Sequence, residues 1–162
     1  MTRLGTLAAS ASLAVALSVP LVGAATAAPA APVTTAAKPS AQATFATKTH
    51  TLVNAQRTKH DVRALKKNAC LTKSAQRQAR RMADQGELFH QDLGKVLDAC
   101  GLNAAGENVA YGYPTPARTV AGWMGSAGHR ANILSGTYRL SGVGAVKKDG
   151  RWYVAQVFGR KA

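Results

Sequence analysis

The stretch "LSGVGAVKKDGRWYVAQVFG", residues 140–159, decides the class of fold. In it, two segments with alternating apolar positions flank the dipeptide Asp149-Gly150. The alternating positions are Val143 and Ala145 before the dipeptide and Trp152, Val154 and Gln156 after it. A period of two is that of a half-buried strand, and Asp-Gly is a strong signal for a two-residue hairpin turn. The C-terminal end is therefore predicted to be a β-hairpin.

Two segments before it have the period of a helix instead. Residues 45–60 carry such a pattern at Phe45, Thr49, Leu52, Val53 and Gln56. Residues 64–86 contain a second predicted helix, with Asn68 as its N-cap and Gly86 at its end. Its apolar stripe is narrow and consists of Leu71, Ala75, Ala79 and Met82.

The middle of the chain, "AGENVAYGY" at residues 105–113, is predicted to be a strand or extended segment. It leads into "TPARTVAGWMG", where Thr115 can cap a helix that has Pro116 at its first position. Val120 and Trp123 face inward in this helix, and "GSAGHRANIL" at residues 125–134 is a further short helical segment. Helices first and a hairpin last indicate an α+β fold and not an alternating parallel one.

The N-terminal third has the composition of a targeting segment followed by a linker. Arg3, an apolar run and small residues near Ala27 predict a secretory signal peptide over residues 1–27. Residues 28–43 are almost entirely Ala, Pro, Thr and Ser, which predicts a flexible linker. Residues 44–162 are then one domain, expected to be secreted, extracellular or wall-associated, monomeric, and without a transmembrane anchor once the signal is cleaved.

Cys70 and Cys100 are the only cysteines of the chain. An even count in an exported protein predicts a disulfide, and no Cys-x-x-Cys redox motif is present. On the chain-entropy argument, closing this loop contributes roughly 3–4 kcal/mol to stability.

The chain is strongly basic, with 21 Lys and Arg against 7 Asp and Glu and a net charge of +14. A charge of this size attracts polyanions, so an anionic wall polymer or surface is the expected partner, beside an unidentified small ligand or protein. The alternative is that the charge serves only solubility. The predicted second helix has a basic face made of Lys73, Arg77, Arg80 and Arg81.

Specific nucleic-acid binding is not expected, because the aromatic residues Trp123, Trp152 and Tyr153 fall at core positions and not among the cations.

Three residues carry the candidate chemistry: His90, Glu107 and His129. Two neutral imidazoles can hold a divalent metal such as zinc, although two protein nitrogens make a weak site. A nearby carboxylate can orient an imidazole or accept a proton from bound water. Each of the three, taken alone, is more often a structural core group. His50 and His60 have no companion motif, and the acids Asp84, Glu87, Asp92 and Asp98 are expected to lie on the surface.

Two further residues of "GSAGHRANIL" belong to the expected binding site. Ser126 has no activating partner at a useful spacing, so it is not expected to be a nucleophile. Asn132 is expected to hydrogen-bond nearby backbone, and Gly128 is expected to permit a close approach before His129.

Four motifs occur in one order along the domain: "LFH", "GENVA", "W-M-x-S-x-G-H-R-x-N-I-L" and "GVGA…WYVAQVFG". In this respect the chain resembles the CAP superfamily of cysteine-rich secretory, antigen 5 and pathogenesis-related 1 proteins, and in particular its bacterial secreted branch. The resemblance covers about residues 52–159. It implies a three-layer αβα sandwich around a central, mostly antiparallel sheet.

The resemblance also implies a surface cavity lined by two histidines and two acids. The histidines match His90 and His129, and the first acid matches Glu107. The second acid lies three residues after the helix tryptophan, where this chain has Ser126. A mechanism that needs two carboxylates is therefore not expected.

Members of this superfamily are described as binders of sterols, lipids, glycans or proteins, and proteolytic and nuclease roles have been suggested. The resemblance and the composition together favour a secreted ligand-binding module with a cavity formed by His90, Glu107, Ser126, His129 and Asn132. The alternative is a metal-dependent, protease-like hydrolase whose metal would be held by His90 and His129. Whether the chain is an enzyme stays open at this point.

Overall fold

The computed structural model describes residues 38–161 of the chain, so the expected signal peptide and the linker up to residue 37 lie outside it. The elements in chain order are α1 (Ala41–Lys59), β1 (Lys66–Lys67), α2 (Ala69–Gln85), α3 (Leu93–Cys100), β2 (Ala104–Tyr111), α4 (Pro116–Gly125), α5 (Ala127–Leu134), β3 (Leu140–Lys148) and β4 (Arg151–Arg160). No helix among these residues is long and apolar enough to cross a bilayer.

The four strands form one mixed sheet in the order β1-β3-β4-β2. β4 is antiparallel to both β3 and β2, and only the short β1 is parallel to its neighbour β3. The predicted hairpin is confirmed: Lys148 pairs with Arg151 across a turn in which Asp149 and Gly150 have φ of 49° and 75°. Two positive φ angles in succession are those of the turn that Asp-Gly favours.

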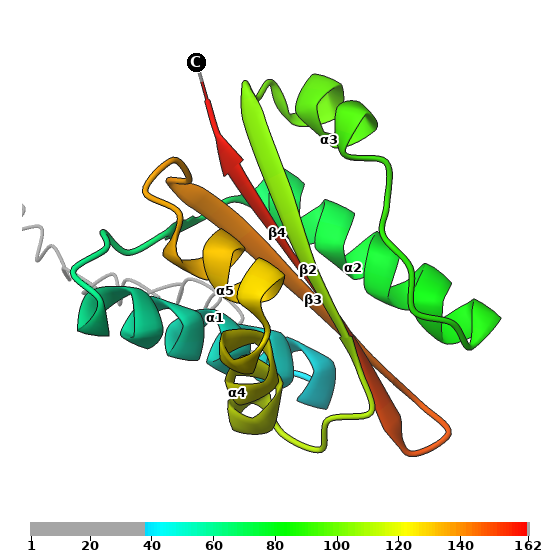
Figure 1. Ribbon diagram of the computed structural model, residues 1–162. Coiled ribbons are helices and arrows are strands. Elements are labelled where there is room, and N and C mark those ends of the chain that lie inside the picture. Colours follow the sequence, from blue (N-terminus) through cyan, green and yellow to red (C-terminus); the bar gives the residue numbers. More distant parts are fainter. Residues whose placement is uncertain (1–37, 162) are drawn as a thin grey trace, which may run out of the picture. The chain divides into compact units, whose positions relative to one another are not determined.

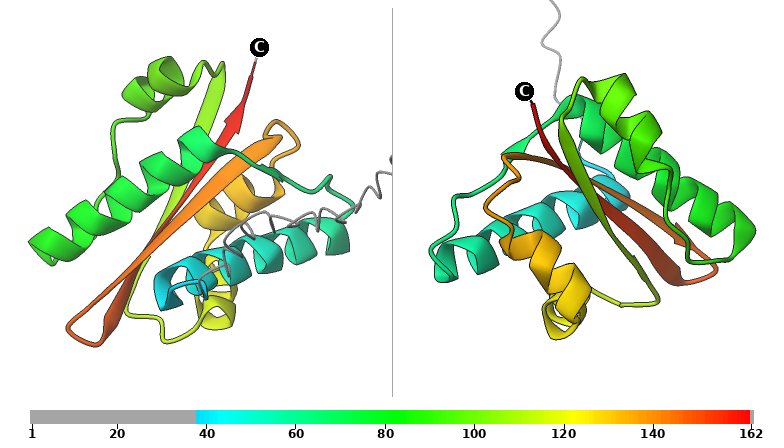
Figure 2. Two further views of the ribbon diagram at one scale, coloured as in Figure 1. Left: turned by 180° about the vertical axis from the view of Figure 1, so that it is seen from behind. Right: turned by 45° about the horizontal axis from the view of Figure 1, so that its top comes forward.

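The sheet is the middle of three layers (Figure 1). α2 and α3 cover one face, and α1, α4 and α5 cover the other, which the views from behind and from above also show (Figure 2). Each face has its own apolar core, one with Leu71 and Met82 from α2 and the other with Phe45 from α1 and Trp123 from α4. The expected αβα sandwich with a mostly antiparallel sheet is confirmed.

Most helix ends lie where the sequence predicts them. Asn68 accepts a hydrogen bond from the backbone N–H of Leu71 at the start of α2, and Gly86 ends that helix in the left-handed conformation with φ 73°. Thr115 caps α4 through the N–H of Arg118. These residues satisfy backbone groups that have no partner inside the helix.

One expected boundary was wrong, and one helix was not predicted. α1 begins at Ala41 with Ser40 as its N-cap, so the end of the expected linker, residues 41–43, forms the first turn of the helix. α3 was not predicted; Asp92 is exposed, as expected for a surface acid, and in addition caps this helix by accepting from the N–H of Lys95. Alanine is common in flexible linkers but also has the highest helix propensity. The composition of residues 41–43 therefore could not show that the helix begins there.

Two glycines of β3 allow α2 to lie directly on the sheet. A Cβ at Gly142 would come within 2.0 Å of the backbone N of Thr72, and one at Gly144 within 2.3 Å of the backbone N of Gln76. The "GVGA" motif is thus a requirement of close helix–sheet packing.

Two long-range links each tie together helices of the same layer. The predicted disulfide between Cys70 and Cys100 is confirmed, with a Cα–Cα distance of 5.8 Å, and it joins the start of α2 to the end of α3. On the other face, the fully buried Arg57 of α1 donates to the carbonyls of Ile133 and Ser135 at 2.7 and 2.9 Å. A cation at this position stabilises the C-terminal end of α5, whose carbonyls have no partner within the helix.

Candidate functional site

Glu107 is a carboxylate buried in the middle of β2, with its side chain only 1% exposed. Oε1 accepts hydrogen bonds from His90 Nδ1 at 2.7 Å and from the backbone N–H of Gln91 at 3.2 Å. Oε2 accepts one from the side-chain amide of Gln91. Three donors satisfy the oxygens of this buried acid, and none of them belongs to a lysine or arginine.

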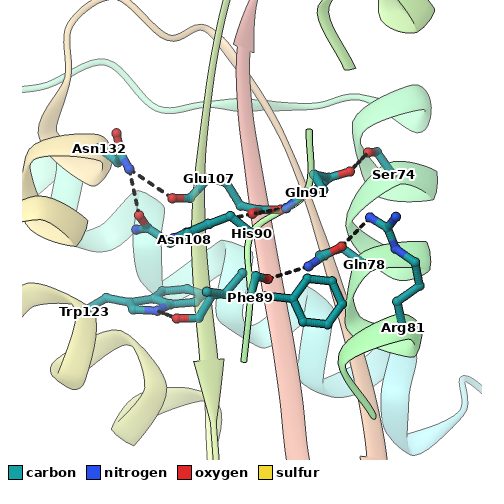
Figure 3. Close-up of polar contacts among 11 residues, drawn as sticks. Ser74, Gln78, Arg81, Phe89, His90, Gln91, Glu107, Asn108, Trp123 and Asn132 are labelled. Carbon is teal, nitrogen blue, oxygen red and sulfur yellow. Dashed lines mark hydrogen bonds and ion pairs between the residues drawn. The ribbon is translucent and has the colours of Figure 1, made fainter. Parts of the chain in front are cut away.

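The hydrogen bonds continue from Glu107 towards α2 (Figure 3). Gln91 Oε1 accepts from the hydroxyl of the buried Ser74 at 2.6 Å. The buried Gln78, one turn further along α2, donates to the carbonyl of Phe89 and so holds the segment that precedes His90. The loop between α2 and α3 is therefore positioned by polar side chains of α2 as well as by Glu107.

His90 has a defined orientation because of Glu107. An ionised carboxylate can only accept, so Nδ1 of His90 must carry a proton. In the neutral ring, Nε2 then has the free lone pair, and the side chain is 60% exposed. His90 can consequently accept a hydrogen bond from a ligand, or bind a metal, through Nε2.

The next residue, Asn108, points to the opposite face and holds α5. Its Nδ2 donates to the carbonyl of His129 at 3.0 Å, and its Oδ1 accepts from Asn132 Nδ2 at 3.0 Å. Asn132 also donates to the backbone carbonyl of Glu107 at 3.1 Å, which confirms the expected contact of Asn132 with nearby backbone. The start of α5, with His129, is thereby attached to the strand that carries Glu107.

His129 is half-buried, and burial lowers the pKa of its imidazole. The positive charge that His90 can carry lowers the pKa of His129 further. No hydrogen bond among residues 38–161 joins the His129 ring to His90 or Glu107. That the three side chains share one cavity stays a prediction.

Ser126 and Gly128 lie at the junction of α4 and α5. Ser126 occupies the N-cap position of α5, but its side chain makes no capping hydrogen bond there. A Cβ at Gly128 would meet nothing within 4 Å, so the expectation that this glycine permits a close approach was wrong. Gly106 has that property instead, since a Cβ there would lie 2.5 Å from the hydroxyl of Tyr138.

The free edge of β2 is covered by side chains instead of a further strand. Alternate carbonyls along this edge accept from Tyr138 OH, Asn132 Nδ2 and Trp123 Nε1 at 3.2, 3.1 and 3.0 Å. The accepting residues are Ala105, Glu107 and Val109. Unpaired strand edges otherwise invite pairing with another chain, so these donors both protect the edge and hold α4 and α5 against it.

The donor set does not suit a stable zinc centre. No group of three or more His, Cys, Asp or Glu side chains able to hold a metal occurs in the described part of the chain. Both oxygens of Glu107 already accept hydrogen bonds, which leaves only the imidazoles of His90 and His129. Catalytic zinc sites usually have three protein ligands, so these two residues fit weak metal binding at most.

Sequence reasoning missed three residues of this site: Ser74, Gln91 and Asn108. Gln91 and Asn108 directly follow His90 and Glu107, and both lie in or beside motifs that were recognised. Polar residues within otherwise apolar segments were the available signal, because a buried amide must find hydrogen-bond partners.

The chain matches a known protein family over most of its domain. Residues 50–158 match the Cysteine-rich secretory protein family, CAP. The chain is also 35% identical over 126 residues to the protein YkwD of Bacillus subtilis, over 74% of this chain and 49% of that protein. The chain belongs to the CAP family.

Solved structures show the same fold. An extracellular protein containing a SCP domain from Bacillus anthracis superposes with a TM-score of 0.68 at 27% identity, over 74% of this chain and 41% of that one. A cysteine-rich secretory protein from Staphylococcus aureus superposes with a TM-score of 0.66 at 23% identity, over 80% and 40%. The chain spans about half the length of YkwD, and less than half of each of these two solved chains.

Proposed function

We propose that the chain is a secreted CAP domain that binds an extracellular ligand at the site of His90, Glu107 and His129, and that it does not hydrolyse this ligand. The observation that carries the proposal is the state of Glu107. Its carboxylate is buried and fully hydrogen-bonded by His90 and Gln91. It acts as a structural acceptor and is not available to substrate.

A hydrolase needs a group that can reach the proton or the carbonyl of its substrate. The position of the second acid of the family is Ser126, for which no activating partner is present among the hydrogen bonds of residues 38–161. The remaining groups, His90 Nε2 and the His129 ring, can hydrogen-bond a ligand without any chemical step. Ser126 precedes the first turn of α5 and Asn132 lies in its last turn, and both belong to the proposed binding surface.

Secretion is supported by three observations. Residues 1–27 have the pattern of a signal peptide, and the domain contains a disulfide, which persists mainly in oxidising compartments. The related Bacillus anthracis protein is described as extracellular. We extend that location to this chain as part of the proposal.

The test compares binding with turnover in one set of variants. The purified secreted chain is passed over cell-wall fractions, lipid vesicles and peptide libraries, and it is separately incubated with protease and esterase substrates with and without zinc. We expect that retention by at least one class of material weakens at least tenfold in His90→Ala and His129→Ala but not in His60→Ala, which changes an exposed histidine outside the site. Zinc-dependent turnover that disappears in His90→Ala and His129→Ala would overturn the proposal in favour of the hydrolase.

A further inference from the structure

A groove of about 860 Å³ lies between α1 and α2, apart from the residues of the His90 site. One wall is the beginning of α1 and the other is the outer side of α2, with Lys67 of β1 and Val143 of β3 between them. The view from behind shows α1 and α2 with β3 between them (Figure 2). One edge of β3 pairs with β4 along its whole length, whereas the other edge pairs with β1 only at Leu140 and Ser141. The groove opens along this second, largely unpaired edge.

Four exposed cations line the groove: Lys67, Lys73, Arg77 and Arg80. No acidic residue lines it, and none of these cations forms an ion pair with an acid of residues 38–161. Residues 1–37 contain no Asp or Glu, so that part of the chain holds no carboxylate that could neutralise the groove. An external anion is therefore the complementary occupant.

The cations of α2 form a row. Lys73, Arg77 and Arg80 are spaced i, i+4 and i+7, which places them on one side of the helix over about 10 Å. Arginine binds phosphate through two parallel N–H groups, and a row of such groups suits an anion that repeats along a chain. Lys67 Nζ donates to Thr47 Oγ1 at 3.4 Å and so brings a further cation next to the α1 wall.

The rest of the lining is uncharged and small. Ser40, Gln42 and Thr47 offer hydroxyl and amide groups, while Ala43 and Ala46 offer methyl groups. His50 borders the groove as well, and its Nε2 is a buried nitrogen without a hydrogen-bond partner. Such a surface can contact both the hydroxyls and the carbons of a flexible polyol between two charged groups.

We propose that this groove binds a linear anionic polymer of phosphodiester-linked polyols, the kind of polymer that a cell wall carries. The inference rests on the proposed extracellular role but uses a different surface from the His90 site. The polymer's phosphates pair with the cations of α2 and Lys67, and its hydroxyls hydrogen-bond the α1 wall.

Two other anionic partners fit the groove less well. Single-stranded nucleic acid is usually held by aromatic stacking, and no Trp, Tyr or Phe lines the groove. A membrane surface is usually met by exposed apolar side chains beside the cations, whereas the exposed large apolar residues of the described chain, Leu88 and Tyr113, lie outside the groove.

The test measures binding of the full secreted chain to soluble polyglycerol phosphate by fluorescence anisotropy between 20 and 300 mM salt. The groove variant carries Lys73→Gln, Arg77→Gln and Arg80→Gln. The matched control carries Arg63→Gln, Lys66→Gln and Lys161→Gln, which removes three charges from exposed residues elsewhere. We expect the groove variant to lose at least tenfold in affinity with a shallower salt dependence, and the control to lose less than threefold.

Equal losses of affinity in the two variants would overturn the inference, because binding would then depend on the total charge of the protein and not on the groove. Absence of polymer binding by the wild type would overturn it as well. Equal or tighter binding of a single-stranded oligonucleotide or of phosphatidylglycerol vesicles would overturn the choice of partner. His90→Ala is expected to bind the polymer like the wild type, so that a failure of the groove and a failure of the His90 site are separate results. Thermal melting of both triple variants checks that they are folded.

Discussion

Glu107 and Asn108 are consecutive residues of β2 whose side chains leave the strand on opposite faces. Glu107 accepts from His90 at 2.7 Å on the α2 face, and Asn108 donates to the carbonyl of His129 at 3.0 Å on the α5 face. The alternation of a strand makes this possible with two adjacent residues. One short segment of β2 therefore positions both histidine-bearing segments, although His90 and His129 lie 39 residues apart in the sequence.

Glu107→Gln is expected to lower the free energy of unfolding by about 1–3 kcal/mol, because its amide donor would face donors of His90 or Gln91. The same change removes the negative charge of residue 107 and leaves one carbonyl oxygen to accept from His90 Nδ1 and from Gln91, so the proton is held less firmly on Nδ1. Urea unfolding measures the first effect, and NMR of the His90 ring nitrogens measures the second. Asp98→Asn, a change of an exposed acid, is the control. If Glu107→Ala, which removes both acceptor oxygens, left the His90 tautomer unchanged, the orienting role of Glu107 would be wrong.

Gly144→Ala is expected to destabilise the domain by about 3 kcal/mol or more, because the added methyl group meets the backbone of α2, which cannot move aside. Gly128→Ala is the opposite case. It adds a methyl group in open space within a helix and is expected to stabilise by about 0.5–1 kcal/mol. Chemical denaturation of the two variants gives both values. Similar effects of the two substitutions would contradict the close α2–β3 contact.

Removal of the disulfide by Cys70→Ser with Cys100→Ser is expected to cost roughly 3–4 kcal/mol, since it frees a loop whose ends are 30 residues apart. The loop includes His90 and Gln91, so hydrogen exchange should also increase at their amides. Peptide mass spectrometry of the non-reduced wild type should show the linked pair. Unchanged stability in the double variant would mean that the loop is held by its polar contacts alone.

Stability is expected to fall as the pH drops below about 6.5, in part through His50. Burial and then the charge of Lys67 lower the pKa of His50 in the folded protein. The unfolded chain therefore binds a proton at a higher pH than the folded one, and protonation favours unfolding. This destabilisation by His50 is absent when the pH is above the pKa of His50 in the unfolded chain. It grows as the pH falls towards the lower pKa of His50 in the folded protein.

Urea unfolding at several pH values between 5 and 8 tests this dependence. His50→Gln should flatten the decline, whereas His60→Gln, at an exposed position, should follow the wild type. An equally steep decline in His50→Gln and the wild type would assign the pH dependence to other groups.

Zinc is expected to bind weakly and saturably, and less so as the pH falls, because protons compete for the imidazoles. His90→Ala and His129→Ala should each abolish this binding, and in His129→Ala the melting temperature should stay close to that of the wild type. Isothermal titration with His60→Ala as a control makes the measurement. Absence of zinc binding in the wild type, together with a lowered melting temperature of His129→Ala, would mean that His129 serves the structure.

The sequence alone determined the elements whose signals are local. Asp149-Gly150 specified the hairpin because few residues other than glycine and Asx tolerate its positive φ angles, and Asn68 and Gly86 marked the ends of α2 because they satisfy its terminal backbone groups. Two cysteines in a chain with an export signal were enough to predict their disulfide. The family followed from four short motifs, and with it the three layers.

Only the tertiary structure decided how the polar residues are paired and where the charges gather. Gln91 and Ser74 lie 17 residues apart in the sequence and meet because α2 and the loop after it pack on the same face of the sheet as Glu107. The groove between α1 and α2 exists because these helices cover opposite faces and leave the side of β3 open between them. Such contacts depend on the packing of whole elements, which is a non-local property, whereas turns and caps depend on a few consecutive residues.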